Sequence, residues 1–155
     1  DTIIGYATAR KLGITADIVG SQASNDNVVA AAKGGATEGY YVAGATRAMY
    51  EDTATPAQRV FMEKYKARYG KNPGVGTLYA YLPTLILLDA LEKAGRDLTV
   101  DKLVAALETV RDFDDGLGTP LHSFTKTDHS GSDGVNLDIV RAGKLRAVAD
   151  GINLQ

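Results

Sequence analysis

The N-terminal apolar pattern predicts a helix followed by a stop. Ile3, Ala7 and Leu12 fall near one face of a helix, with Ile4 beside them. Gly13 follows at the position where a left-handed residue commonly ends a helix. We therefore expect a short helix that ends near Gly13.

Two strand-like runs then enclose a second helix. The runs ITADIVG (14–20) and EGYYVAG (38–44) are rich in the β-branched and aromatic residues of buried strands. Between them, NVVAAAKGG predicts a helix with Ser24 or Asn25 as its N-cap. Residues 1–44 therefore look like a piece of an open α/β sheet with short loops.

The middle of the chain predicts three helices in succession. Thr55 can cap the first and Gln58 completes a capping box, while Pro56 suits the first helical position. Gly70 closes that helix, and Thr99 caps the third. The expected ranges are 56–69, 77–94 and 99–110.

The last segment, NLDIVRAGKLRAVAD, predicts two strands joined by a tight turn at Ala142 and Gly143. The chain thus passes from a βα unit to helices without a sheet of their own, and then returns to strands. This order indicates a chain that crosses between two lobes. Part of the partner sheet is then expected to lie outside this sequence.

The longest apolar run extends from Leu78 to Leu91 and is interrupted by Pro83, Thr84 and Asp89. It is shorter than the roughly 20 residues that a bilayer requires. We interpret it as a core helix rather than a membrane span.

Composition narrows the classes of function. The 155 residues are 45% hydrophobic and 23% charged, which is ordinary for one globular domain. A net charge of −2 provides no basic field for a polyanion, so neither nucleic acid nor an anionic membrane is an expected partner. The absence of cysteine excludes disulfides, zinc–thiolate sites and thiol catalysis. The N-terminus has neither an initiator Met nor a signal peptide, so we expect the chain to begin within a longer protein.

Four segments together resemble a known family. They are ARKLGITADIVGSQASND…EGYYVAG, TPAQRVFMEKYKARYGKNP, LLDALEKAG and FTKTDHSGSDGVNLDIVRAGKLRAV. Their order and spacing are similar to the C-terminal part of solute-binding proteins of the branched-chain amino acid (Leu/Ile/Val) type. These proteins are the substrate receptors of bacterial ABC importers, and the resemblance covers essentially the whole chain.

The resemblance implies part of a type I periplasmic-binding-protein fold, in which two α/β lobes joined by three crossovers close on a small molecule. It places the N-terminal lobe's own sheet upstream of Asp1. The implied segments are a C-terminal-lobe α/β segment at 1–44, a crossover at 45–55, helices and a strand of the N-terminal lobe at 56–127, and a crossover with returning strands of the C-terminal lobe at 128–155.

The resemblance also implies a receptor that is periplasmic, or lipid-anchored outside the cytoplasmic membrane. It would bind an amino acid, an amide or an aromatic or organic acid and hand it to an ABC permease. This function needs no catalytic residue, metal or cofactor.

The loop GSQASND follows the strand predicted at 14–20, at the strand end where open α/β sheets bind ligands. In amino-acid-binding relatives, a carboxylate at the position matching Gln22 answers the ligand's ammonium group. A neutral amide cannot offset a buried cation in this way, so Gln22 favours an amide or an organic or aromatic acid. The alternative is that Gln22 lies in a solvated turn and that Ser24, Asn25 or Asp26 caps the next helix. The candidate ligand-binding residues of this loop are Gln22, Ala23 and Ser24.

The loop NPGVGT (72–77) precedes a helix, so its backbone N–H groups can receive an anion. It matches neither the P-loop nor the dinucleotide-binding glycine pattern, and a plain flexible loop is the commoner case. The family places this region near the mouth of the cleft. Val75, Thr77 and Tyr79 are therefore further candidate lining residues.

Three other residues have a plain and a functional interpretation. Tyr40 and Tyr41 lie in the second predicted strand, where core packing is commoner than ligand stacking. Arg47 can pair a ligand carboxylate, although a solvated arginine is the commoner case.

The stretch TDHSGSDG (127–134) resembles an active site in composition only. Neighbouring side chains of an extended loop diverge, so Asp128 and His129 are poorly placed as orienter and base. His122 and His129 are the only histidines and have no clear third metal ligand. Asp, Ser and Gly are typical of tight turns, so we interpret the stretch as a polar turn after a short LHSF strand.

Two alternative functions stay open at this point. The extracellular sensor module of a receptor uses the same clamp, and a transmembrane helix in the complete gene would distinguish it. A small α/β enzyme would instead show a titratable pair with strongly perturbed pKa values in a deep pocket.

We predict that the isolated 155-residue chain self-associates or rearranges. Its three central helices would expose apolar faces meant for an absent sheet, and burial of each large apolar side chain is worth roughly 1.5–3 kcal/mol. Sedimentation over a wide concentration range and hydrophobic-dye binding test this. A chain that stays monomeric and binds no dye would contradict it.

Overall fold

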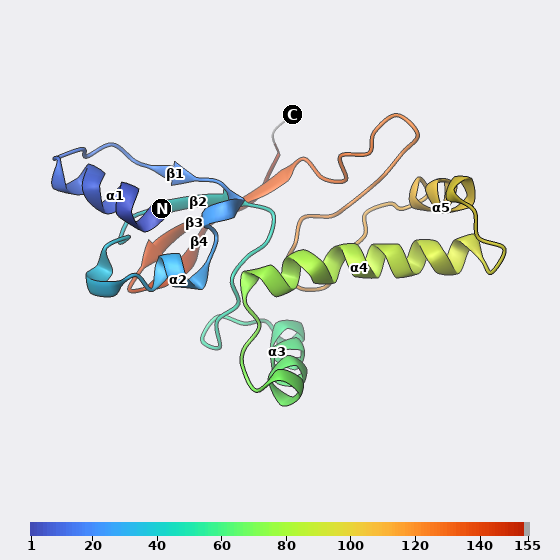
Figure 1. Ribbon diagram of the computed structural model, residues 1–155, viewed down its shortest axis with the longest axis horizontal. Helices are drawn as coiled ribbons and strands as arrows, with labels where there is room; N and C mark the ends of the chain where they lie inside the picture. The colour runs from blue at the N-terminus through green and yellow to red at the C-terminus, as the bar shows by residue number, and fades with distance from the viewer. Residues whose placement is uncertain (154–155) are drawn as a thin grey trace.

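A mixed sheet combines residues from both ends of the chain. The computed structural model describes residues 1–153 and contains a four-stranded sheet of order β1-β2-β3-β4 (Figure 1). β1 and β2 run parallel, whereas β3 is antiparallel to both β2 and β4. The strands are β1 (Val19–Gly20), β2 (Tyr41–Gly44), β3 (Gly134–Arg141) and β4 (Lys144–Asn153). The predicted α/β class is confirmed.

The first strand is shorter than the predicted range 14–20. Val19 and Gly20 pair with β2. Before them, the Arg10 guanidinium donates to the carbonyl oxygens of Ile14 and Ala16 at 2.7 and 2.8 Å. These two carbonyl oxygens therefore accept from Arg10, and backbone bonding to β2 begins at Ile18, whose carbonyl oxygen accepts from Tyr41 N at 3.1 Å.

Helix α1 (Thr2–Lys11) buries Tyr6 rather than the aliphatic residues of the predicted apolar face. Tyr6 is 4% exposed, and its ring meets that of Tyr40 edge to face with centroids 5.1 Å apart. Ile4 and Leu12 remain largely in solvent. Gly13 follows with a φ of 81°, as the predicted stop requires. Tyr40 is thereby a core residue, as expected.

The second helix is capped by Asp26, not by Ser24 or Asn25 as the leading interpretation had it. In α2 (Asn27–Ala30), the Asp26 carboxylate accepts a hydrogen bond from Val28 N at 2.6 Å. Ser24 and Asn25 are buried at the preceding 3₁₀ turn η1 (Gln22–Ser24), so their side chains serve other partners. The helix also ends earlier than predicted, before the 3₁₀ turn η2 (Lys33–Gly35).

The strongest local signals are confirmed. Helix α3 (Pro56–Tyr69) has the predicted reciprocal capping box of Thr55 and Gln58, and Gly70 closes it with a φ of 70°. The β3–β4 turn places Ala142 and Gly143 at φ values of 50° and 73°, as a two-residue hairpin turn requires.

The remaining helices are displaced slightly from their predicted ranges. Helix α4 (Val75–Ala94) begins earlier than expected, and α5 (Val100–Leu107) ends earlier. Thr99 caps α5 as predicted by accepting from Lys102 N at 3.2 Å. The expected LHSF strand is wrong as a regular strand. Only isolated bridges occur there among the described residues, joining Phe113 to His122 and Ser123 to Gly131.

The side chains pack into two units. The sheet unit consists of α1, α2 and the four strands, and the helical unit consists of α3, α4, α5 and the loops between 108 and 127 (Figure 1). Segments 45–55 and 128–134 connect the two units. The sheet-unit core contains Tyr6, Ala30, Tyr40, Val42, Val140 and Leu145. The helical-unit cores contain Met49, Ala54, Met62, Leu78 and Leu117, and Leu82, Ile86 and Val110.

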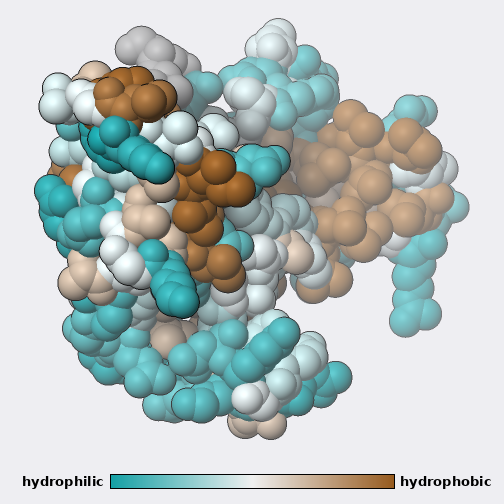
Figure 2. Space-filling view, turned by 60° about the vertical axis from the view of Figure 1, so that its left-hand side comes forward, coloured by the Kyte–Doolittle hydropathy of each residue, from teal (hydrophilic) through white to brown (hydrophobic). Residues whose placement is uncertain are grey.

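Helices α4 and α5 leave an apolar face uncovered. Leu87, Leu88, Val100 and Val104 are all exposed, and Figure 2 shows hydrophobic side chains gathered toward this end of the molecule. Helix α4 is long and apolar enough to cross a membrane by length and composition, and 28% of that stretch is buried. A soluble core helix passes the same test, so the finding is weak support for a membrane span.

We predict that Thr55→Ala lowers the free energy of unfolding by about 1 kcal/mol, because Gln58 N loses its capping acceptor. Urea denaturation, followed by the helical circular dichroism signal, measures the change in the free energy of unfolding. Thr8→Ala, at an exposed position inside α1, is the matched control and should cause no loss. Equal effects of the two substitutions would contradict the assigned cap.

Candidate functional site

Gln22 and Thr46 meet at the carboxyl ends of the two parallel strands. Gln22 lies in η1 directly after β1, and Thr46 follows β2. The Gln22 Nε2 donates to Thr46 Oγ1, and Gln22 Oε1 accepts from Thr46 N, both at 3.0 Å. The two bonds fix the amide plane and the position of the chain that leaves β2.

Gly44 allows this approach because it has no side chain. A Cβ atom at Gly44 would lie 2.2 Å from Gln22 Oε1, far inside van der Waals contact. The Gln22 amide therefore lies directly across the end of β2. This close approach depends on Gly44. The sequence pattern predicted only that Gly44 belongs to a strand.

Tyr79 reaches the same place from the helical unit. Its hydroxyl, on the first turns of α4, donates to the Gln22 carbonyl oxygen at 3.2 Å. Partial burial raises the pKa of Tyr79, and a hydrogen bond with Thr46 opposes that shift. The phenol therefore stays protonated and can act as a donor. The Tyr79 side chain remains partly exposed to solvent.

Only some of the six candidate residues come together. Gln22 and Tyr79 are in direct contact. Ala23 is exposed beside Gln22, and Thr77 is half-buried two residues before Tyr79 in α4. Ser24 and Val75 are buried, and Ser24 Oγ is engaged by Ser21 O at 2.7 Å and by the Tyr40 hydroxyl at 3.1 Å.

Asn25 is a member of this group that the sequence marked only as a helix cap. Its side chain is 4% exposed, and its Nδ2 donates to the carbonyl oxygen of Thr46. Its Oδ1 has no hydrogen-bond partner among the described residues. Asn25 and Tyr79 both contact the Gln22–Thr46 pair through neutral groups.

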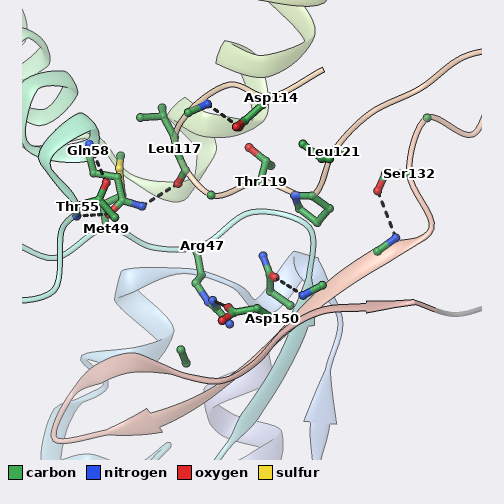
Figure 3. A pocket seen from close by; sticks show the side chains of 18 of the residues that line it. Arg47, Met49, Thr55, Gln58, Asp114, Leu117, Thr119, Leu121, Ser132 and Asp150 are labelled. Carbon is green, nitrogen blue, oxygen red and sulfur yellow. Dashed lines mark hydrogen bonds and ion pairs between the residues drawn. The ribbon is translucent and has the colours of Figure 1, made fainter. Parts of the chain in front are cut away.

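A large cavity lies elsewhere, between the two units. It has a volume of about 1050 Å³ and none of the six candidates lines it. Its walls come from the 45–55 connection, the 114–121 loop, the 128–134 connection and the β3–β4 hairpin (Figure 3). Thr46 contacts Gln22 whereas Arg47 lines this cavity, so the connection separates the two sites.

Arg47 is one of the charged residues that line that cavity. Its Nε donates to Asp138 Oδ1 at 2.6 Å, and Figure 3 shows its guanidinium turned toward Asp150, with which it also pairs. Its Nη2 donates to Ala149 O at 2.8 Å and to Leu137 O at 3.3 Å. Arg47 is therefore half-buried and paired within the chain, whereas the commoner interpretation was a solvated arginine.

Asp138 explains why Arg47 is held there. The carboxylate is 2% exposed, and burial raises its pKa while the hydrogen bond and charge of Arg47 lower it. The two residues lie 91 positions apart. The only sign of this buried ion pair in the sequence was Asp138, a single acidic residue between the apolar residues of NLDIVR.

A second ionic group lies further along the same connection. Asp52 accepts from Arg146 Nη2 at 2.7 Å and from Lys144 Nζ at 3.1 Å. These bonds, Arg146 first, hold the pKa of Asp52 well below its usual range. The Tyr50 hydroxyl accepts from Leu145 N at 3.0 Å, so the connection follows the hairpin as far as Asp52.

The TDHSGSDG stretch forms the polar turn that its composition predicted. Asp128 Oδ1 accepts from Ser130 N at 2.9 Å and from Ser130 Oγ at 2.6 Å, and these bonds lower the pKa of Asp128. His129 Nε2 instead lies 3.1 Å from Glu108 Oε1. Within residues 1–153, no group of three potential ligands is arranged for a metal ion.

The mixed sheet and the helices around it define an α/β domain, and the match to a family model identifies its family. Residues 1–144 match the model of the family described as periplasmic binding protein, and the chain belongs to this family. The family that the sequence resemblance implied is thereby confirmed. No curated protein matches the chain significantly.

Solved structures of substrate-binding proteins share the fold. A fatty acid ABC transporter substrate-binding protein from Thermomonospora curvata is 28% identical with a TM-score of 0.79, over 99% of this chain and 41% of that one. A branched-chain amino acid ABC transporter structure with bound valine, from Thermus thermophilus, is 19% identical with a TM-score of 0.72, over 98% and 43%. A leucine-binding protein from Thermotoga maritima is 24% identical with a TM-score of 0.71, over 95% and 40%.

The chain therefore spans about two fifths of the length of these solved structures, for example 41% of the Thermomonospora protein. The family and these structures are binding proteins rather than enzymes by their descriptions. The partial form of the fold agrees with the sequence-based expectation.

We predict that Arg47→Gln lowers the free energy of unfolding at neutral pH by about 3 kcal/mol, because it leaves the Asp138 carboxylate buried without a cation. The loss of Arg47 also raises the pKa of Asp138 further. A carboxyl group whose pKa is higher in the folded state destabilises the fold above its unfolded pKa, and this cost disappears at lower pH. The stability difference from wild type should therefore shrink as pH falls toward 3.8, the ordinary value for Asp138.

Chemical denaturation between pH 4 and pH 8 measures this difference. The double variant Arg47→Gln, Asp138→Asn is the control, because it has no carboxylate at 138 to titrate. If Arg47→Gln lowered the free energy of unfolding by the same amount at every pH, the buried pairing would be contradicted.

Proposed function

We propose that the chain is the C-terminal part of a solute receptor of an ABC importer, which binds a small organic molecule between two lobes. The family membership and the substrate-binding proteins that share the fold support this proposal. The ligand would contact Gln22, Ala23, Thr77 and Tyr79, whereas the candidates Ser24 and Val75 are buried. A membrane permease would receive the ligand on the outer side of the cytoplasmic membrane.

The domain division follows from the same proposal. Residues 1–44 and 128–155 belong to the C-terminal lobe, 45–55 is a crossover, and 56–127 covers a sheet of the N-terminal lobe; positions 154 and 155 of this division lie outside the described residues. The exposed apolar face of α4 and α5 supports this division, because an apolar helix face in a soluble protein is normally covered. The remainder of the receptor would supply that sheet and the opposite wall of the ligand cleft.

The observation that carries the ligand class is the neutral Gln22–Thr46 pair. Gln22 uses both amide atoms on Thr46, and the donor that reaches it from α4 is the neutral Tyr79 hydroxyl. An ammonium group placed against this wall would lose its hydration without gaining a carboxylate. The wall therefore suits an amide or an organic or aromatic acid better than an α-amino acid. The similar Thermomonospora protein is described as a fatty acid binder, which is consistent with a ligand without an ammonium group.

A thermal-shift screen of the full-length receptor tests the proposal. A ligand that binds only the folded state stabilises it by about 2.7 kcal/mol when present at 100 times its Kd. We expect amides and organic or aromatic acids to raise the melting temperature more than leucine or valine does. If leucine or valine stabilised the receptor as strongly as any other compound, the proposed ligand class would be wrong. If no small solute raised the melting temperature, the result would count against the receptor function.

The variant Gln22→Glu isolates the role of the neutral amide. It supplies a carboxylate at the wall, so we expect it to weaken acid binding and to improve binding of leucine. Ala57→Glu, in the exposed first turn of α3, adds the same charge away from the site and is the control. Equal changes in the two variants would show that net charge, not the wall, decides affinity.

A further inference from the structure

Cations are concentrated in helix α3 and directly after it. Five of the chain's 17 lysine and arginine residues, but one of its 19 acidic residues, lie between positions 59 and 71. The cations are Arg59, Lys64, Lys66, Arg68 and Lys71, the acid is Glu63, and all six residues are exposed. This cationic segment (59–71) carries a charge of +4, whereas the whole chain carries −2. The net charge that made an anionic membrane an unexpected partner averages over this separation.

Most of these cations have no counter-ion within the chain. Among residues 1–153, Lys66 is the one cation of the segment that forms an ion pair, with Glu51 at 3.9 Å. Lys64 and Arg68 lie one turn apart on α3, and no acidic residue lies three or four positions from either of them. Glu63 lies one turn from Lys66 instead. One side of α3 is therefore positive without compensation.

The stability of α3 does not by itself account for this charge. Cations in the last turn stabilise the C-terminal end of the helix dipole, which explains Lys66 and Arg68. Arg59 lies near the N-terminal end, where the dipole disfavours a cation. Like charges four positions apart, such as Lys64 and Arg68, also destabilise a helix slightly. The pattern therefore points to a use outside the helix.

An exposed aromatic residue lies beside the cations. Tyr69 is 56% exposed, its ring centroid lies 4.5 Å from that of Tyr65, and the Arg68 guanidinium lies 5.7 Å from the Tyr69 centroid. Val60, one turn before Lys64, is 50% exposed. Figure 1 shows α3 at the lower edge of the molecule, and the lower edge of Figure 2 is mostly hydrophilic. A tyrosine with an apolar ring and a polar hydroxyl suits the boundary between a membrane and water.

The kind of cation favours one class of anionic partner. Three of the five are lysines, and lysine is depleted at protein–protein interfaces, whereas arginine is enriched there. A lysine carries a compact, strongly hydrated charge on a flexible stem, which suits a diffuse anionic surface better than one fixed carboxylate. A cluster of Lys and Arg on a helix, accompanied by an interfacial aromatic ring, is typical of segments that bind anionic lipid headgroups.

We propose that the cationic segment 59–71 is a membrane-contact surface that binds the headgroups of anionic phospholipids. Each lysine or arginine near such a surface strengthens binding by about a factor of 5, so the contact is reversible and sensitive to salt. The proposed function contributes only a use for this contact. A receptor that delivers its solute to a permease would be held beside the membrane that contains the permease.

Vesicle co-sedimentation of the full-length receptor tests this surface. Vesicles of phosphatidylcholine alone are compared with mixed vesicles of phosphatidylcholine and phosphatidylglycerol. We expect the receptor to bind the mixed vesicles at low salt and not the neutral ones. Added sodium chloride should release it, because salt screens exposed charges.

The double variant Lys64→Gln, Lys71→Gln removes two exposed cations that form no ion pair among the described residues. We expect its partition coefficient on the mixed vesicles to fall about 25-fold, at a factor of about 5 for each charge. The double variant Lys33→Gln, Lys126→Gln is the control, because it removes the same charge from exposed positions outside the segment. It should change the partition coefficient far less. An unchanged melting temperature verifies that both variants are folded.

Three results would overturn the proposal. Equal binding to neutral and mixed vesicles would indicate apolar contact alone. Equal losses in the two double variants would indicate an effect of net charge alone. Absence of binding to the mixed vesicles at low salt would exclude a lipid partner for the segment. Because no ligand takes part in this assay, its failure is distinguishable from failure of the receptor function, which the ligand screen detects.

Discussion

The pairing of Arg47 with the buried Asp138 constrains the rest of the structure. A carboxylate that is 2% exposed is strongly destabilising without a cation, so the connection after β2 must lie against the β3–β4 hairpin. The same guanidinium binds Asp150 and two backbone carbonyls of the hairpin. One side chain thereby joins segments about a hundred residues apart, and it determines the direction in which the chain leaves the sheet.

That direction places the candidate site. Thr46 precedes Arg47 and meets Gln22 through two hydrogen bonds of 3.0 Å, over a Gly44 that has no side chain to obstruct them. The ionic pairing on one side of the connection and the neutral amide pairing on the other are therefore parts of one arrangement. Charged groups line the large cavity, whereas the Gln22–Thr46 contact that Tyr79 reaches is made by neutral groups.

The helical unit has a different physical basis. Its helices are defined by their own caps and apolar spacing, and yet α4 and α5 keep Leu87, Leu88 and Val100 exposed. Strong local signals can form a helix without its full tertiary cover, because backbone hydrogen bonds and caps act within a few residues. This agrees with a chain that spans only about two fifths of similar solved structures, such as 41% of the Thermomonospora protein.

The sequence by itself determined the α/β class, the capping box at Thr55 and Gln58, and the hairpin turn at Ala142 and Gly143. These features depend on residues no more than a few positions apart, so their physics is visible in a short window. Tertiary structure decided that Tyr6 rather than Leu12 enters the core, that β1 is short, and that Arg47 is buried against Asp138. Each of those outcomes depends on a partner that is distant in sequence, and a side chain's burial or charge state is set only when the fold brings that partner into contact.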